Sequence, residues 1–265
     1  MIIGISGKIG AGKDLTGKIF QYLADKQGMG LTTLDSEKDF GEYCKGIRTN
    51  QSWEIKKFAD ALKDIACILI GCTRKDLENV NFKNSFLDPK WNITVNSPGD
   101  APMTVRTFLQ KLGTDALRTN LHPNTWVNAL MSKYKDKRWV NKAEWDFHKT
   151  GKYNPKDNLP IYPNWIITDV RFLNEATAIK EAGGVMIRVS RDPIAPLQQE
   201  HISETALDDY KGFDYLINNN RTIEHLIIVI KSIYGNINRP DSSSPEALYP
   251  GEVERLCVPG VKLAE

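Results

Sequence analysis

Cysteine and histidine are scarce in this sequence, and neither is spaced as a metal site. The chain has 4 Cys and 4 His among 265 residues. The cysteines form no CxxC pair and have no zinc-ligand spacing, which argues against a zinc module and favours a reduced, cytosolic setting. The segment HISE at residues 201–204 lacks the second histidine of an HExxH motif. We expect structural or surface roles for the histidines, including a His201–Glu204 pair at a helix start.

Long apolar runs and a charge excess of one sign are also missing. Apolar runs such as residues 226–230 are far shorter than the roughly 20 residues that a membrane span needs. The 35 Lys and Arg nearly balance the 33 Asp and Glu, giving a net charge of +2 and a pI near 8.2. Such a balance provides no strong field for a membrane or nucleic acid. We expect neither partner, and we expect no targeting segment before the first strand.

A glycine-rich loop of the form GxxxxGK lies near the start of the chain. It reads GKIGAGKD at residues 7–14. An apolar run at residues 1–6 precedes it, and Leu15, Ile19 and Leu23 follow at four-residue steps, as on the buried face of a helix. A strand, this loop and a helix in that order are typical of an ATP-binding phosphate loop, whereas an isolated match to the letters would be weak. The predicted ATP-binding residues are Gly7, Lys8, Ile9, Gly10, Ala11, Gly12, Lys13 and Asp14.

The roles within this loop follow from its chemistry. Glycines without a Cβ let the backbone take positive φ and bring its amides close to phosphate oxygens. The helix that follows directs its positive end at the same oxygens. We expect Lys13 to reach the β- and γ-phosphates of ATP.

Asp14 departs from the usual pattern, in which a Ser or Thr hydroxyl follows the lysine and binds Mg²⁺. A carboxylate so near a polyphosphate needs a cation between the two. We therefore predict that Asp14 holds Mg²⁺, directly or through water. The alternative is a first-turn carboxylate that stabilises the helix N-terminus. Thr16 is no simple substitute, because two residues along a helix is about 200° around it.

Strands alternate with helices along most of the chain, which predicts an α/β fold with a parallel sheet of about five strands and helices on both faces. The expected strands are residues 1–6, 54–59, 165–168, 185–190 and 213–217. The expected helices, apart from the one after the loop, are residues 60–70, 104–120, 123–134, 174–182 and 222–234. One domain is expected over residues 1–237, with insertions at about 80–102 and 135–163, followed by a linker-like extension at 238–265.

The second insertion mixes basic and aromatic residues. Lysines and one arginine outnumber the carboxylates in residues 133–157, and Trp139, Trp145 and Tyr153 lie among them. Such a mixture could hold nucleic acid. The alternative is a solvated excursion whose aromatic rings pack on the rest of the protein.

Polar residues follow the predicted strand at 165–168. Ligands of open parallel sheets bind at the carboxyl ends of strands, which directs attention to Asp169 and Arg171. Asp169 could hold Mg²⁺ through water, and Arg171 could pair with a phosphate, with a turn cap and a surface ion pair as the alternatives. Asn174 is expected to cap the next helix. Glu175 could pair with Arg171 or contact a substrate.

The predicted helix at 104–120 places Arg106, Gln110 and Gly113 at i, i+4 and i+7. An arginine can hold a monophosphate, an amide can read a base edge, and a glycine admits a ring. An ordinary amphipathic helix, buried through Val105, Leu109, Leu112 and Ala116, would have the same spacing. The remaining candidate substrate ligands are Thr114, Asp115, Lys63 and Trp126.

Several segments together resemble the deoxynucleoside monophosphate kinases of T-even-type tailed phages, within the P-loop kinase group. The shared segments are the loop ending in GKD, FADALKD, VRTFLQKLGTDALR followed by Trp126, ITDVRFLNE, HISE, and FDYLINNN followed by TIEHL. They span most of residues 1–234 but not 25–52, 80–102, 135–163 or the tail.

That resemblance implies a three-layer P-loop kinase fold and transfer of the ATP γ-phosphoryl group to a deoxynucleoside monophosphate. Typical acceptors are dGMP, dTMP and hydroxymethylated dCMP. It also implies Mg²⁺, a homodimer and the host cytoplasm as location. Phosphoryl transfer depends on positioning and on cations, for which the candidates are Lys13, Arg106 and Arg171, with Arg188 or Arg191 as a lid arginine or a plain surface charge.

Two other functions fit parts of the sequence. A phosphomevalonate-kinase-like enzyme shares the GKD loop but acts on an anionic isoprenoid precursor, for which a basic site is expected. A DNA-handling ATPase would use the basic insertion as its grip. Gln110 and Gly113 favour a base over a carboxylate, and the small net charge argues against DNA.

Overall fold

The chain forms two compact units, which are described separately. The computed structural model describes residues 1–28, 36–46, 51–91, 102–135, 162–192, 202–238 and 261–263. The first unit comprises Met1–Lys57 and Tyr134–Glu265, and the second comprises Phe58–Lys133. In the described part of the chain, no helix is long and apolar enough to cross a membrane.

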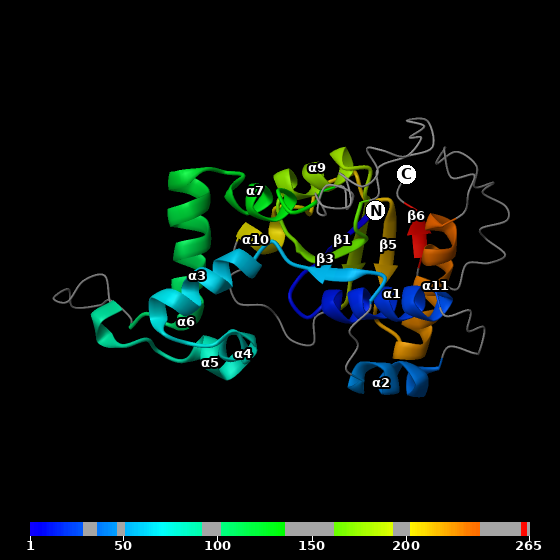
Figure 1. Ribbon diagram of the computed structural model, residues 1–265, viewed down its shortest axis with the longest axis horizontal. Coiled ribbons are helices and arrows are strands. Elements are labelled where there is room, and N and C mark those ends of the chain that lie inside the picture. Colours follow the sequence, from blue (N-terminus) through cyan, green and yellow to red (C-terminus); the bar gives the residue numbers. More distant parts are fainter. Residues whose placement is uncertain are drawn as a thin grey trace, which may run out of the picture. The chain divides into compact units, whose positions relative to one another are not determined.

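The first unit contains one sheet with the strand order β2-β3-β1-β4-β5-β6 (Figure 1). Its first five strands are mutually parallel, and the short β6 is antiparallel to β5. The strands are β1 (Ile2–Ser6), β2 (Glu54–Lys56), β3 (Trp165–Val170), β4 (Val185–Ser190), β5 (Tyr215–Asn218) and β6 (Val261–Leu263).

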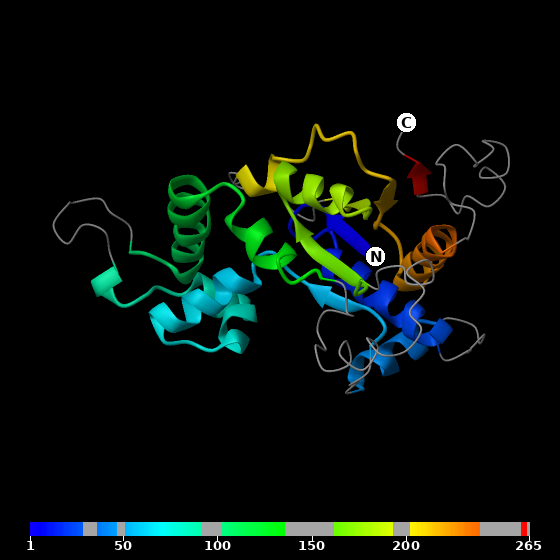
Figure 2. The same ribbon diagram turned by 45° about the horizontal axis from the view of Figure 1, so that its top comes forward.

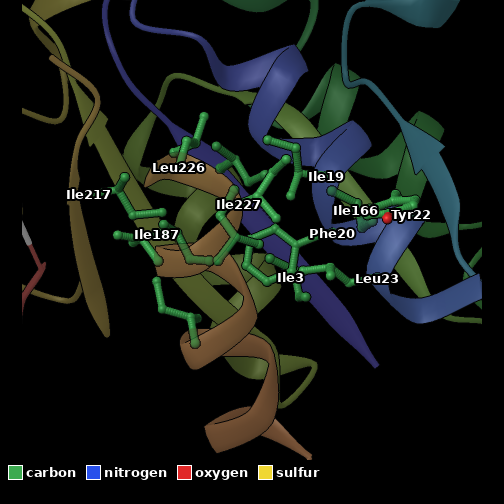
Figure 3. Close-up of a cluster of buried hydrophobic side chains, with 14 of the residues drawn as sticks. Ile3, Ile19, Phe20, Tyr22, Leu23, Ile166, Ile187, Ile217, Leu226 and Ile227 are labelled. Carbon is green, nitrogen blue, oxygen red and sulfur yellow. The ribbon is translucent and has the colours of Figure 1, made fainter. Parts of the chain in front are cut away.

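Helices cover both faces of this sheet (Figure 2). On one face, Ile3 and Ile5 of β1 belong to a core shared with α1 and α11 (Figure 3). On the other face, Gly4 lies against Met186 of β4 and Ile179 of α9. All five residues of β1 are buried, as the central strand of a doubly covered parallel sheet requires. The helices of this unit are α1 (Lys13–Gly28), α2 (Glu37–Lys45), α9 (Leu173–Glu181), α10 (Ile202–Thr205) and α11 (Ile223–Ile237).

The second unit is helical, with a small core of its own. Ala66, Leu77, Met103, Val105 and Phe108 are buried together there. An isolated bridge pairs Phe86 with Thr104. The helices are α3 (Asp60–Ile70), α4 (Arg74–Glu78), α5 (Val80–Asn84), η1 (Pro89–Trp91), α6 (Val105–Gln110), η2 (Lys111–Leu121) and α7 (Thr125–Met131).

The predicted α/β class with a five-stranded parallel sheet is confirmed, and most element positions agree with the sequence. The strand at 185–190 and the helix at 60–70 have the predicted bounds. Gly71 ends the latter in the left-handed region with φ 69°, as glycine at a helix C-terminus commonly does. The chain divides into two compact units, and the expectation that residues 1–237 form one domain stays a prediction.

Four expectations about elements need correction. The strand β3 runs to Val170, so Asp169 lies within it, because β1 still pairs there through Ser6. Residues 80–102, expected to lack regular structure, contain α5 and η1. The tail, expected to be linker-like, contributes β6, and residues 25–52, whose elements the sequence pattern left undetermined, contain α2. The helix after β3 begins at Leu173 rather than at a cap on Asn174.

The helix predicted at 104–120 has two parts with different geometry. It begins as α6, capped by the Thr104 side chain, and continues as the π-helix η2. Hydrogen bonds from i+5 to i widen the turn of a π-helix, so residues at α-helical spacing no longer share one face. Gly113 is accordingly buried whereas Gln110 and Ala116 are exposed. The predicted common face of Gln110 and Gly113, and the burial of Ala116, are therefore wrong.

Candidate functional site

The phosphate loop lies in the first unit between β1 and α1, as predicted. Gly10 and Gly12 have φ angles of 80° and 97°, which L side chains rarely adopt. Gly7 begins the loop where β1 ends, and a Cβ there would lie 2.3 Å from the Val189 carbonyl oxygen of β4. The glycines of the motif thus serve both the turn and its close packing on the sheet.

Asn219, which follows β5, holds the loop from the side. Its Nδ2 donates to the carbonyl oxygen of Ala11 at 2.9 Å, and both residues are buried. A Cβ on Gly12 would lie 2.4 Å from the same Nδ2. This contact joins residues 208 positions apart in the sequence. Nothing in the local pattern of residues 7–14 indicates it. The three asparagines at residues 218–220, where β5 ends, are polar residues at the carboxyl end of a strand, which is the signal that could have indicated this contact.

Lys13 folds back over its own loop. Its Nζ donates to the carbonyl oxygens of Gly7 at 2.6 Å and Lys8 at 2.8 Å. Burial, followed by the nearby charge of Arg171, lowers the pKa of Lys13 to about 8, against the smaller opposing effects of Glu204 and Asp14. The ammonium group is therefore partly desolvated and lies against the loop. A phosphate bound there would supply a negative charge that favours the charged form of Lys13.

Asp14 lies among a lysine and a hydroxyl group that the sequence reasoning did not identify. Its Oδ1 accepts from Lys57 Nζ at 2.8 Å and from Thr168 Oγ1 at 2.6 Å. Burial alone would raise the pKa of Asp14, but these hydrogen bonds and the charges of Lys57 and Lys13 lower it below its ordinary value. Lys57 follows β2 and Thr168 lies within the neighbouring strand β3. The parallel register pairs Lys56 with Ile167, so the next residue of each strand is also brought close.

The residues around Asp14 fit a divalent cation. Within the described chain, Asp14 Oδ2 accepts no hydrogen bond, and the carboxylate is ionised beside the phosphate loop. Mg²⁺ commonly takes one or two carboxylates and completes its shell with phosphates and water. Among described residues there is no group of three or more His, Cys, Asp or Glu that could hold a metal without such help. Asp169, half-buried within β3, stays a prediction as a second ligand.

Arg171 is held by two glutamates in different ways. The Glu175 carboxylate accepts from the backbone amides of Arg171 at 2.8 Å and Phe172 at 3.1 Å, and so caps the start of α9. The Arg171 guanidinium pairs with Glu204 of α10. Glu204 is thus an ion-pair partner of Arg171 that the sequence did not predict. The buried Glu175 carboxylate caps α9, and its expected pairing with the Arg171 side chain stays a prediction. Whether Glu175 contacts a substrate stays a prediction, and His201 lies outside the described residues.

Arg188 lies within β4 instead of following it. Its guanidinium donates to Ser6 Oγ at 3.1 Å and to Asp208, and it lies 5.7 Å from the centre of the Phe213 ring. Asp208 also lies 3.7 Å from Lys8 Nζ of the loop. Arg188 is held within the sheet, because β4 pairs with β5 through this position, and its role as a lid arginine stays a prediction. Arg191 follows β4.

The predicted substrate ligands at 104–121 lie in the second unit. Arg106 is half-buried and its Nε donates to Asn84 Oδ1 at 3.0 Å, whereas Gln110 is exposed. Thr114 is half-buried and Asp115 is exposed. These four side chains keep groups that could contact a ligand, and their roles stay predictions.

Gly113, Trp126 and Lys63 are engaged within the second unit. A Cβ on Gly113 would lie 2.7 Å from Leu62 Cδ2, so a leucine of α3 fills the space expected for a substrate ring. Trp126 is 4% exposed and its Nε1 donates to the Gly113 carbonyl oxygen at 2.9 Å. Gly113 and Trp126 thus have packing roles within the second unit, and their expected substrate contacts stay predictions. Lys63 pairs with Glu78 at 2.5 Å.

The sheet order and the glycine-rich loop between β1 and α1 are those of an α/β protein with a P-loop kinase fold. The family model for deoxynucleotide monophosphate kinase matches residues 55–230, more than half of the chain. The chain therefore belongs to the deoxynucleotide monophosphate kinase family and is a phosphotransferase. It is also 29% identical over 191 residues to a protein of Acanthamoeba polyphaga mimivirus, which is provisionally named a deoxynucleotide monophosphate kinase. That similarity covers 69% of this chain and 84% of the viral protein.

The family match begins after the phosphate loop. Residues 7–14 precede the matched segment, which starts at residue 55. Nucleotide binding by residues 7–14 therefore stays a prediction, which is supported by the loop geometry and by the contacts of Lys13, Asp14 and Asn219.

Proposed function

We propose that this protein transfers the γ-phosphoryl group of ATP to a deoxynucleoside monophosphate, giving the diphosphate and ADP. The observation that carries the proposal is the desolvated Lys13 ammonium beside the positive-φ loop at the end of β1. A phosphate oxygen of the acceptor attacks the γ-phosphorus in line, while the bond to the oxygen shared with the β-phosphate breaks. Such a reaction needs positioning and positive charge rather than a covalent intermediate.

The chain's own residues would divide this work. The loop amides hold the triphosphate, and Lys13 moves from its carbonyl partners onto the β- and γ-oxygens. Arg171 adds a second positive charge on the side of the loop facing Glu204. Because the reaction is electrostatic, each of these donors is worth more in a partly desolvated site than in water.

Asp14 is the residue proposed to hold Mg²⁺, with Thr168 orienting its carboxylate through the 2.6 Å hydrogen bond. A bound Mg²⁺ would supply charge neutralisation and would orient the phosphates. Without a bound metal, the hydrogen bond and charge of Lys57 help to keep the Asp14 carboxylate ionised by lowering its pKa.

The acceptor is proposed to bind through residues of the second unit. Arg106 would hold its monophosphate, and Gln110, Thr114 and Asp115 are the side chains left to recognise base and sugar. On the resemblance, dGMP, dTMP and modified dCMP are the proposed acceptors, and a homodimer in the cytoplasm is the proposed form. A nucleic-acid partner is not proposed, and most of the basic insertion lies outside the described residues.

The test is a screen of purified protein with ATP, Mg²⁺ and each deoxynucleoside monophosphate, following ADP production. We expect acceptor-dependent ADP release with at least one acceptor. Lys13→Ala should lower kcat at least about 100-fold, because it removes a preorganised charge from the transferred group.

Lys18→Ala is the matched control, because Lys18 lies on the same helix and is exposed. It should leave turnover unchanged. Absence of phosphorylated product with every acceptor would refute the proposed reaction, and an active Lys13→Ala variant would refute the role of the loop.

A further inference from the structure

Glu204 joins two parts of the phosphate site that are far apart in the sequence. It lies on α10 and is 9% exposed. Its Oε2 accepts from the backbone amide of Ile9 in the phosphate loop at 2.8 Å, and its Oε1 accepts from Arg171 Nη1. One buried carboxylate thus bridges the loop and the arginine that follows β3.

The two bonds of Glu204 use different oxygens, so a loss of charge would affect them differently. An amide oxygen in place of Oε2 could still accept from Ile9. The amide nitrogen in place of Oε1 is a donor and could not accept from a guanidinium. Charge-assisted hydrogen bonds of this kind are about twice as strong as neutral ones, so the Arg171 contact depends most on the carboxylate.

A second glutamate, Glu175, accepts from the Arg171 backbone amide at 2.8 Å and caps the start of α9. Glu204 contacts the guanidinium itself and, with its other oxygen, a loop amide. Glu204 therefore connects the charged end of the Arg171 side chain to the loop.

Both members of this ion pair also act on Lys13. Arg171 lowers the pKa of Lys13, and Glu204 raises it. The guanidinium, the carboxylate and the ammonium therefore lie near one another at the loop.

We propose that Glu204 is a positioning residue, which holds the Arg171 guanidinium toward the nucleotide phosphates and fixes the loop at Ile9. The inference rests on the proposed function, because the phosphates of ATP are the groups that Arg171 would meet. It assigns Glu204 no contact with substrate.

The experiment compares Glu204→Gln with Glu204→Asp in the full-length protein, measuring kcat, KM and the ATP dissociation constant by calorimetry. Loss of charge in Glu204→Gln should weaken ATP binding roughly tenfold, as expected for a hydrogen bond to a charged group. It should lower kcat by about 10-fold to 100-fold, because misplacement of a positioned group has effects of that size. Glu204→Asp keeps the charge and should retain more activity than Glu204→Gln.

A role limited to packing predicts the reverse order, because Gln has the size of Glu and Asp is one methylene shorter. Melting temperatures would then follow the activities. The exposed Asp209→Asn is the control, and it should change neither binding nor turnover.

A double-mutant cycle tests whether Glu204 acts through Arg171. In an Arg171→Ala background, Glu204→Gln should change ATP binding and kcat less than about twofold, because the guanidinium that it positions is gone. Full additivity would overturn the proposal. ATP binding can be measured without an acceptor, so additive effects of the two substitutions on the ATP dissociation constant would contradict the role of Glu204. Normal ATP binding without transfer to any monophosphate would instead contradict the proposed reaction.

Discussion

At the scale of single residues, the site disfavours the charged form of Lys13, and a bound phosphate would favour it. Burial and the neighbouring Arg171 lower the pKa of Lys13 to about 8, so the free protein holds its proton less firmly than an ordinary lysine would. Its donors rest on the Gly7 and Lys8 carbonyl oxygens. A polyphosphate favours the charged form and should raise the pKa again.

The lowered pKa predicts a pH dependence of ATP binding. Below about pH 8 the free protein already holds the proton of Lys13, and above that pH it must take one up to bind ATP. Affinity for ATP without divalent cations should therefore fall as pH rises through about 8. Calorimetry in buffers of different ionisation enthalpy should show proton uptake near pH 8.

Lys13→Arg is the comparison, because a guanidinium stays charged over this range. Its ATP affinity should be flat between pH 7 and pH 9, or at least flatter than that of the parent protein. An equal decline in both proteins would assign the pH dependence to another group.

At the scale of elements, the close packing of α1 on β3 decides where the phosphate loop and Asp14 lie. A Cβ on Gly17 of α1 would lie 2.4 Å from Thr168 Cγ2 and 3.3 Å from Ile166 Cγ2. The hydroxyl of the same Thr168 donates to Asp14 at 2.6 Å. A change in helix–strand spacing would therefore reach the carboxylate directly.

Gly17→Ala tests this coupling. The added methyl group must push α1 from β3 or rotate Thr168, and we expect a loss of about 1–3 kcal/mol in the free energy of unfolding. Urea denaturation gives this value, and the Mg²⁺ dependence of turnover should change with it. Gly41→Ala on α2 has no atom within 4 Å of the new Cβ. It should be neutral or stabilising by up to about 1 kcal/mol, and a similar loss there would contradict the packing argument.

At the scale of the whole molecule, the proposed donor and acceptor residues belong to different compact units. Lys13, Asp14 and Arg171 belong to the first unit, whereas Arg106 and Gln110 belong to the second. The family match at 55–230 includes residues of both. Each substrate should therefore protect a different set of residues when it binds alone.

Hydrogen exchange measured with each substrate alone checks this division. ATP should slow exchange of the amides at residues 7–14, because those amides would bind phosphate. A deoxynucleoside monophosphate should slow exchange at residues 104–121. Lys13→Ala should remove the first effect and leave the second. Acceptor protection restricted to the first unit would move the proposed acceptor site away from Arg106.

Much of the fold could be read from local patterns. Apolar runs indicated the strands, helical spacing and Gly71 bounded α3, and the glycines and lysine of residues 7–14 indicated a phosphate loop. These features depend on neighbours a few residues away, which is why one sequence suffices. Its alternation of strands and helices also determined the parallel sheet.

Contacts over long sequence distances were decided only by the tertiary structure. Asn219 beside Ala11, Lys57 and Thr168 at Asp14, and Glu204 bridging Ile9 and Arg171 each join separate strands, loops or helices. The π-helix η2 likewise moved Gly113 into contact with Leu62, which α-helical spacing could not foresee. The sequence by itself determined most of the strands and helices and the glycine-rich loop, because short-range sterics and periodicity govern them. Only the tertiary structure decided which side chains surround that loop, because they come from β3, from α10 and from the segments after β2 and β5, which are far apart in the sequence and are brought together by folding.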